Sequence, residues 1–203
     1  MTTPPASATA LPGWVFGYGS LVNHLTHDSR PLRPARLRGW RREWCLTALR
    51  PVAFLSVRPD PGGRIDGLAA EVHPDAWPAL DLREHAYDRH AAELETALPG
   101  QAAVYAVAPR HRAAGPGGAI LLSYLDVVAE GYDHHFGAAG LDAFFATTDG
   151  WDRPVADDRA APLYPRHRDV AAGLRDRVDA HLDRLGLSPC SAEITLAKAA
   201  GQF

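Results

Sequence analysis

The chain has 203 residues, of which 46% are hydrophobic and 22% are charged. This length and balance fit one folded domain, or one domain with an extension, and exclude a fully disordered or fibrous chain. The formal net charge of −3 gives no overall field that would hold the chain on nucleic acid or on an anionic membrane. We therefore expect a small-molecule partner, no nucleic acid and no membrane.

The ends of the chain and its cysteines bear on location. Residues 1–12, rich in Thr, Pro and Ala, lack the basic start and apolar stretch of a secretory signal and predict a flexible N-terminal tail. The sequence contains no run of about 18 apolar residues, so we predict no membrane span. Cys45 and Cys190 match no metal-binding spacing and are expected to be buried free thiols. These features favour a cytoplasmic protein and leave its oligomeric state, monomer or dimer, open.

The first half of the chain is divided into short apolar runs bounded by Gly, Pro and Asp, which is typical of strands. The sequence Pro-Asp-Pro-Gly-Gly at 59–63 predicts a turn. We predict six strands: one from Trp14 into the glycines at 17 and 19, and others at 35–47, 53–57, 64–72, 87–94 and 102–108.

The second half changes to helical spacing. Residues 120–131 predict a helix with Gly131 as its C-cap, and residues 169–186 an amphipathic helix that ends at Gly186. Shorter helices are expected at 75–80 and 141–145, and the aperiodic residues 149–165 predict a long loop. We expect an α+β fold, a small mixed β-barrel of about six strands with flanking helices. Residues 13–145 would form the barrel domain, and residues 146–203 a loop and C-terminal helix packed on it.

The segment Gly17-Tyr18-Gly19-Ser20-Leu21 is the densest special stretch of the sequence. Two glycines after a buried strand let the backbone turn sharply and aim amide N–H groups into a concavity, where they can hold a carboxylate or a phosphate. An ordinary tight turn explains the glycines equally well. A serine-nucleophile elbow needs glycines at the positions of Tyr18 and Val22, and the dinucleotide and Walker patterns also fail.

Residues 81–90 carry seven Asp, Glu, Arg or His side chains between a short helix and a strand. At a barrel rim a carboxylate can be partly desolvated, which shifts its pKa towards a value useful for proton transfer. A solvated surface turn is the alternative, but the apolar Ala86 and Tyr87 within the run favour a partly buried carboxylate.

Two further clusters have simpler interpretations. The group His24-x-x-His27-Asp28 and the pair His134-His135 match no named zinc spacing, so we expect no metal site. The arginines interleaved with Trp40 and Trp44 resemble a platform for single-stranded nucleic acid. We interpret them instead as residues of the outer face of a barrel strand; they are Arg30, Arg33, Arg36, Arg38, Arg41, Arg42 and Arg50.

Taken in order, several segments resemble the γ-glutamylcyclotransferase superfamily, and its ChaC-like, glutathione-specific branch in particular. The resemblance spans roughly residues 15–132, about two thirds of the chain. It is carried by the segments 15–21 and 35–42, Asp66-Gly67, Leu82-Arg83-Glu84 with Tyr87, and 115–118 with Ser123-Tyr124-Leu125.

The resemblance implies a lyase that needs no cofactor. The α-amine of a γ-glutamyl substrate would attack its own γ-carbonyl carbon, giving 5-oxoproline and releasing the acylated amine. Glu84 matches the catalytic glutamate of the family and would act as general base. The resemblance also assigns substrate binding to Tyr18, Gly19, Ser20 and Leu21, whose backbone amides would hold a carboxylate or oxyanion, and to Tyr87 and Tyr124.

Two departures from the family pattern bear on the substrate. Val22-Asn23 replace an aromatic residue usual in ChaC-like proteins, so we expect the far end of the substrate to be recognised differently. Residues 144–165 extend beyond the family core, and we hypothesise that Trp151 and Tyr164 fold over the pocket mouth. Glutathione is the expected substrate, with cysteinylglycine as the released amine. The alternatives are γ-glutamyl amino acids or γ-glutamylamines, or a barrel that binds a small ligand or partner without turnover.

Overall fold

A closed barrel of five strands forms the centre of the fold in the computed structural model, which describes residues 13–27, 31–115 and 117–199. Its strand order is β3-β1-β5-β4-β2, and pairing of β2 with β3 closes the ring. β1 and β5 are parallel and the other barrel neighbours antiparallel, so the barrel is mixed as predicted. The strands are β1 (Gly13–Gly17), β2 (Leu32–Cys45), β3 (Phe54–Val72), β4 (Tyr87–Leu94), β5 (Ala102–Val107) and, beside β2, the short β7 (Thr148–Asp149).

One long strand replaces two that the sequence predicts. Residues 53–57 and 64–72 were expected to be separated by a turn, but both pair with β2 and belong to β3. The pairs Arg38–Arg64 and Trp40–Pro59 are separated by Gly39 on β2 and by residues 60–63 on β3. The Pro-Asp-Pro-Gly-Gly sequence therefore forms a bulge, because β2 pairs on both sides of it and keeps the two halves in line.

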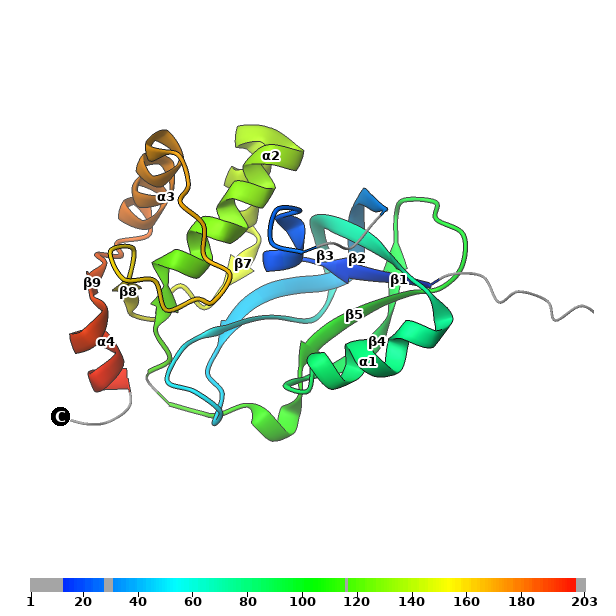
Figure 1. Cartoon of the computed structure of the whole chain (residues 1–203), viewed down its shortest axis with the longest axis horizontal. Helices are drawn as coiled ribbons and strands as arrows, with labels where there is room; N and C mark the ends of the chain where they lie inside the picture. Colours follow the sequence, from blue (N-terminus) through cyan, green and yellow to red (C-terminus); the bar gives the residue numbers. More distant parts are fainter. Residues whose placement is uncertain (1–12, 28–30, 116, 200–203) are drawn as a thin grey trace, which may run out of the picture.

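Helices lie on both sides of the barrel, with α2 and α3 side by side at one end and α1 at the other (Figure 1). Beside α4, three short strands pair in parallel as a small second sheet in the order β6-β8-β9. The helices are α1 (Trp77–Arg83), α2 (Leu122–Ala146), α3 (Ala172–Arg184) and α4 (Ala192–Ala199), with 3-10 turns η1 (Ser20–Val22), η2 (Pro74–Ala76) and η3 (Pro109–His111). The small sheet comprises β6 (Ile120–Leu121), β8 (Val155–Asp157) and β9 (Cys190–Ser191). None of the helices in the described residues is both long and apolar enough to span a membrane.

Gly131 does not end its helix, as the sequence predicts, but lies within α2. A Cβ atom there would lie 2.7 Å from the backbone nitrogen of Asn23. Glycine is thus needed for the close approach of α2 to the residues after η1. The short helix expected at 141–145 is the end of α2 beyond a kink at Gly137, whereas Gly186, with φ +72°, ends α3 as predicted.

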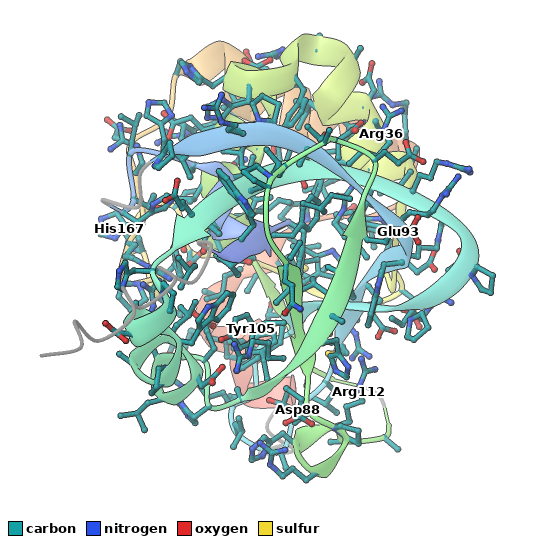
Figure 2. The ribbon with its side chains drawn as sticks, turned by 90° about the vertical axis from the view of Figure 1, so that its right-hand side faces the viewer. Arg36, Asp88, Glu93, Tyr105, Arg112 and His167 are labelled. Carbon is teal, nitrogen blue, oxygen red and sulfur yellow. The ribbon has the colours of Figure 1, made fainter. Side chains whose placement is uncertain are left out.

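The exposed arginines of β2 are neutralised by neighbouring strands. Arg36 pairs with Asp66 at 2.7 Å, and Arg38 with Glu93 at 3.3 Å. Figure 2 shows Arg36 and Glu93 on the same side of the barrel. Their positions support the outer-face interpretation and leave these guanidinium groups engaged with carboxylates.

Arg42 is a correction to that interpretation, because it is only 1% exposed. Its guanidinium carbon lies 5.1 Å from the centroid of the Tyr132 ring and 5.2 Å from that of the Phe144 ring, and the group donates to the Tyr132 hydroxyl at 2.9 Å. It also donates to the backbone oxygen of Asp66 and the hydroxyl of Thr148. A buried cation with this many acceptors joins β2, β3 and α2 inside the fold. The cysteine expectation needs a correction too: Cys45 is buried, but Cys190, in the outermost strand of the small sheet, is exposed.

Candidate active site

A cavity of about 520 Å³ opens between the turn after β1, the junction of α1 with β4, and the start of α2. Every residue that the sequence predicts for the site lines this cavity: Tyr18, Gly19, Ser20, Leu21, Glu84, Tyr87 and Tyr124. Its volume is in the range of small-molecule sites. The fold thus brings residues 18–21 and Glu84 to one space, although more than sixty positions of sequence separate them.

The glycine turn is closed by its own backbone. The amides of Val22 and Asn23 donate to the carbonyl oxygens of Gly19 and Ser20. The amides of Ser20 and Leu21 precede the first internal bond of this turn, and such leading N–H groups need other acceptors. A turn of this kind can supply donors to an anion without supplying a charged side chain.

Gly19 is required for space. A Cβ atom at this position would lie 2.6 Å from the hydroxyl oxygen of Tyr124, too close for any non-bonded contact. The contact with Tyr124 is a steric constraint on this position, whose φ of −119° lies outside the left-handed region that favours glycine. Tyr124 therefore lies directly against the turn.

Glu84 is held by backbone bonds on both sides. It is the C-cap of α1, where its amide donates to the carbonyl oxygen of Leu80 at 2.9 Å. Its own carbonyl oxygen accepts from the amide of Tyr87 at 2.7 Å, which starts β4 immediately. The next residue but one, Ala86, is buried, in agreement with a partly apolar run.

Arg83 is the ion-pair partner of Glu84, with 3.4 Å between Nε and Oε1. The side chains of Arg83 and Glu84 are 50% and 30% exposed, and both residues line the cavity. An ion pair at this exposure contributes less than about 1 kcal/mol. Arg83 therefore does not lock the carboxylate, which stays free to exchange this partner for a ligand.

Three of the five tyrosines that line the cavity among the described residues, Tyr18, Tyr87 and Tyr124, are neutral hydroxyl groups. Burial raises the pKa of Tyr18, Tyr87 and Tyr124 well above the ordinary tyrosine value. The Tyr18 hydroxyl donates to the carbonyl oxygen of Tyr105 at 2.7 Å, and that of Tyr87 to the carbonyl oxygen of Leu55 at 3.3 Å. Among the described residues that line the cavity, the acidic ones are Glu71 and Glu84, and the arginines are Arg50, Arg83 and Arg166.

A segment that follows β8 covers one side of the cavity. We call residues 159–166 the cap segment; its residues Leu163 to Arg166 line the cavity. The ring of Tyr164 meets that of Tyr124 edge-on, with centroids 5.0 Å apart. This agrees with half of the sequence hypothesis. The other half is wrong, since Trp151 stacks on Phe145 at 5.0 Å and is not among the described residues that line the cavity.

Asp158 anchors the cap segment and was not predicted. It is 3% exposed and accepts hydrogen bonds from the amide of Ser123 at 2.8 Å, from the Ser123 hydroxyl and from the amide of Leu163. Arg159 adds a bridge from the cap segment to Asp126 of α2 and Asp179 of α3, each at 2.8 Å. Nothing in the local sequence distinguishes Asp158 from the other aspartates of this loop.

Basic residues at the edge of the cavity were also missed. Arg50, which the sequence analysis placed on the outer face of a strand, lines the cavity together with Arg166 and His27. Arg166 lies over the ring of Tyr164 and donates to its hydroxyl at 3.1 Å. The two guanidinium groups make the cavity suited to a ligand with a second carboxylate.

Two predicted features lie elsewhere. Val22 and Asn23 are buried against α2, and neither is among the described residues that line the cavity, so the departure at these positions does not alter its wall. Of the group His24, His27 and Asp28, from which no metal site was expected, Asp28 lies outside the described residues and His27 contacts the carbonyl oxygen of Leu21 at 2.9 Å. His24 instead meets the two histidines of α2.

The comparisons with known proteins agree with this geometry. A family model described as gamma-glutamyl cyclotransferase, AIG2-like, matches residues 15–120. No curated protein matches the chain. A solved gamma-glutamyl cyclotransferase structure aligns at a TM-score of 0.55 and 13% identity, covering 84% of this chain and 99% of its own. The uncharacterized human protein loc79017 aligns at 0.53 and 14%, covering 82% and 97%. Identities this low show a shared fold.

Proposed function

Because the chain belongs to the γ-glutamyl cyclotransferase, AIG2-like family and is an enzyme of that type, we propose that it converts glutathione to 5-oxoproline and cysteinylglycine. The observation that supports this proposal most is the meeting of Glu84 and the amides of residues 19–21 in one small cavity. A general base and a cradle for an anion are the two devices that the cyclisation requires.

The proposed reaction rearranges bonds within one molecule. Glu84 takes a proton from the substrate α-ammonium, and the freed amine attacks the γ-carbonyl carbon of the same glutamyl group. A C–N bond forms, the attacking nitrogen gives up a second proton, the amide C–N bond breaks, and the departing nitrogen takes up both protons and leaves as an ammonium group. Because nucleophile and electrophile are already joined, the enzyme gains most by folding the substrate and moving the proton.

The glycine turn would bind the glutamyl end of the substrate. Backbone amides at Ser20 and Leu21 can donate to the α-carboxylate or to the oxygen that becomes negative during attack. The neutral hydroxyl of Tyr124, which already touches this turn, can donate to the same group. Tyr87 would close the cavity between this end and Glu84.

The preference for glutathione is drawn from the basic edge of the cavity. Arg50 and Arg166 line the same cavity as Glu84, and the glycine carboxylate of cysteinylglycine would be a partner for either guanidinium. A γ-glutamyl amino acid also carries a carboxylate there. A simple γ-glutamylamine does not, which makes it the poorest fit.

A substrate series tests the proposal. The full chain is incubated with glutathione, γ-glutamyl-alanine and γ-glutamyl-lysine, and 5-oxoproline is measured for each. Highest kcat/KM with glutathione is the expected result. Faster turnover of either other substrate would overturn the glutathione preference and keep the cyclotransferase. Ligand binding without 5-oxoproline from any of them would favour the non-catalytic barrel. A place in the ChaC-like branch and a cytoplasmic location stay predictions.

A further inference from the structure

Three histidines from two distant parts of the chain meet outside the cavity. His24 follows η1, and His134 and His135 are consecutive in α2. The ring of His24 lies 4.5 Å from that of His134 and 5.2 Å from that of His135, and the two α2 rings are 4.7 Å apart, all between centroids. One ring nitrogen from each can be chosen so that all three lie within 4.8 Å of one another.

The fold holds this cluster by buried contacts next to it. Asn23, only 1% exposed, donates from its side-chain amide to the carbonyl oxygen of Val127 at 2.9 Å and to Glu130 at 2.7 Å. The missing side chain of Gly131 lets the backbone at Asn23 approach α2 closely. These contacts hold Asn23 on α2 about one turn before His134 and His135. They thereby place the next residue, His24, beside the two histidines of the helix.

The cluster has the chemistry of a metal site. Neutral imidazole nitrogen is a ligand for zinc, nickel, copper and iron, whereas calcium and magnesium prefer oxygen. Nitrogens bound to one tetrahedral zinc ion lie about 3.3 Å apart, given Zn–N bonds of about 2.0–2.1 Å. Small side-chain rotations bring nitrogens that now lie within 4.8 Å to that spacing. His134 is exposed, so a fourth position is open to water.

We propose that His24, His134 and His135 bind one divalent transition-metal ion of the zinc type. None of the three is among the described residues that line the cavity, so the ion takes no part in the proposed cyclisation. Its effect is to tie the segment after η1 to α2. A ligand that binds only the folded chain also stabilises it, in proportion to the logarithm of its concentration.

Zinc binding to the full chain without an affinity tag, after treatment with chelator, tests the proposal. Calorimetric titration with zinc chloride should give one tight equivalent, and cobalt should give the strong visible absorption of a four-coordinate site. His134→Gln and His24→Gln should each weaken zinc binding about tenfold or more, since even an outer-shell change has effects of this size. His90→Gln, at an exposed histidine of β4, should bind zinc like the wild type.

Thermal unfolding provides a second measurement. Zinc should raise the Tm of the wild type and of His90→Gln but not that of His134→Gln. Because His134 is exposed, its replacement should leave the metal-free Tm unchanged. The proposal is overturned if no tight equivalent is found, or if both cluster variants bind zinc as well as the control. These readouts do not depend on 5-oxoproline formation, so the proposed function can fail while the metal site stands.

Discussion

At the scale of single residues, the proposed chemistry depends on the basicity of Glu84, which a nearly isosteric change can remove. Glu84→Gln should lower kcat for 5-oxoproline formation by about a hundredfold or more, the usual scale for a general base. KM should change little, because the amide keeps the shape of the cavity. Steady-state kinetics with glutathione measures both.

Glu93→Gln is the matched control for this variant. Glu93 is an exposed glutamate on β4, and its ion-pair partner Arg38 is also on the surface. It should retain wild-type kcat. Wild-type turnover by Glu84→Gln itself would remove the general base from the proposal.

The contact between Gly19 and Tyr124 gives a second prediction. A Cβ atom at Gly19 would lie 2.6 Å from the Tyr124 hydroxyl but 3.4 Å from its next neighbour, on Leu55. Gly19→Ala should therefore displace Tyr124 and lower kcat/KM about ten- to a hundredfold, since small misplacements in a site are costly. In a Tyr124→Phe background, the same alanine meets no hydroxyl and should cost much less.

A double-mutant cycle on kcat/KM measures this coupling. Equal losses from Gly19→Ala in the two backgrounds would show that the alanine acts through something other than the hydroxyl. In that case position 19 would require glycine because of the backbone conformation of the turn, and not because of the contact with Tyr124.

At the scale of elements, the cap segment depends on one buried carboxylate, that of Asp158, which accepts hydrogen bonds from Ser123 at the start of α2. Asp158→Ala removes the acceptor of three hydrogen bonds, two of them from Ser123. Leaving these donors unpaired should cost about 1–3 kcal/mol. For a chain of this size each kcal/mol lowers Tm by about 2–4 °C.

The same variant should raise KM for glutathione more than it lowers kcat. Leu163 to Arg166 would no longer be held against the cavity, whereas Glu84 and the glycine turn lie on other elements. Asp152→Ala, at an exposed aspartate between β7 and β8, serves as the control for kinetics and Tm. A fall in kcat with unchanged KM would contradict a positioning role for the cap segment.

Local sequence patterns predicted most elements but not their continuity. The bulge of β3 contains strong turn residues, and only pairing of both halves with β2 makes it one strand. In the sequence, Gly131 resembles the end of a helix. The contact that requires glycine there comes from Asn23, more than a hundred positions earlier, and is not visible in the local pattern. In both cases a long-range contact overrides the local preference.

At the scale of the whole molecule, the site residues on the glycine turn and on the α1–β4 junction could be predicted because each lies in a family motif. Their convergence is a property of the closed barrel, in which β5 lies between β1 and β4. Asp158, Arg50 and Arg166 could not be predicted, since their roles arise only where the cap segment meets the barrel. The same is true of His24, which the sequence paired with His27 and the fold places against α2.

The packing of α3 on α2 predicts how the stability of the molecule changes with pH. His181 of α3 is 9% exposed and stacks on Phe145 at 4.1 Å. Its Nδ1 faces the guanidinium of Arg184 at 2.8 Å, and because arginine can only donate, this nitrogen is an acceptor. Nε2 then carries the hydrogen and donates to Asp142 at 2.9 Å. The neutral ring is satisfied on both sides, and protonation would break the contact with Arg184.

Burial, with a further contribution from Arg184, lowers the pKa of His181 in the folded chain, and the pull of Asp142 in the other direction is smaller. The unfolded chain takes up a proton at about pH 6.5 while the folded chain does not. The stability from this group is therefore complete above that pH and is lost as the pH falls towards the folded pKa. Urea unfolding at about pH 7.5 and about pH 5.5 should show a smaller loss of unfolding free energy in His181→Gln than in the wild type. An equal loss in both would mean that the folded and unfolded chains take up this proton at the same pH, and that the contact with Arg184 does not hold the ring neutral.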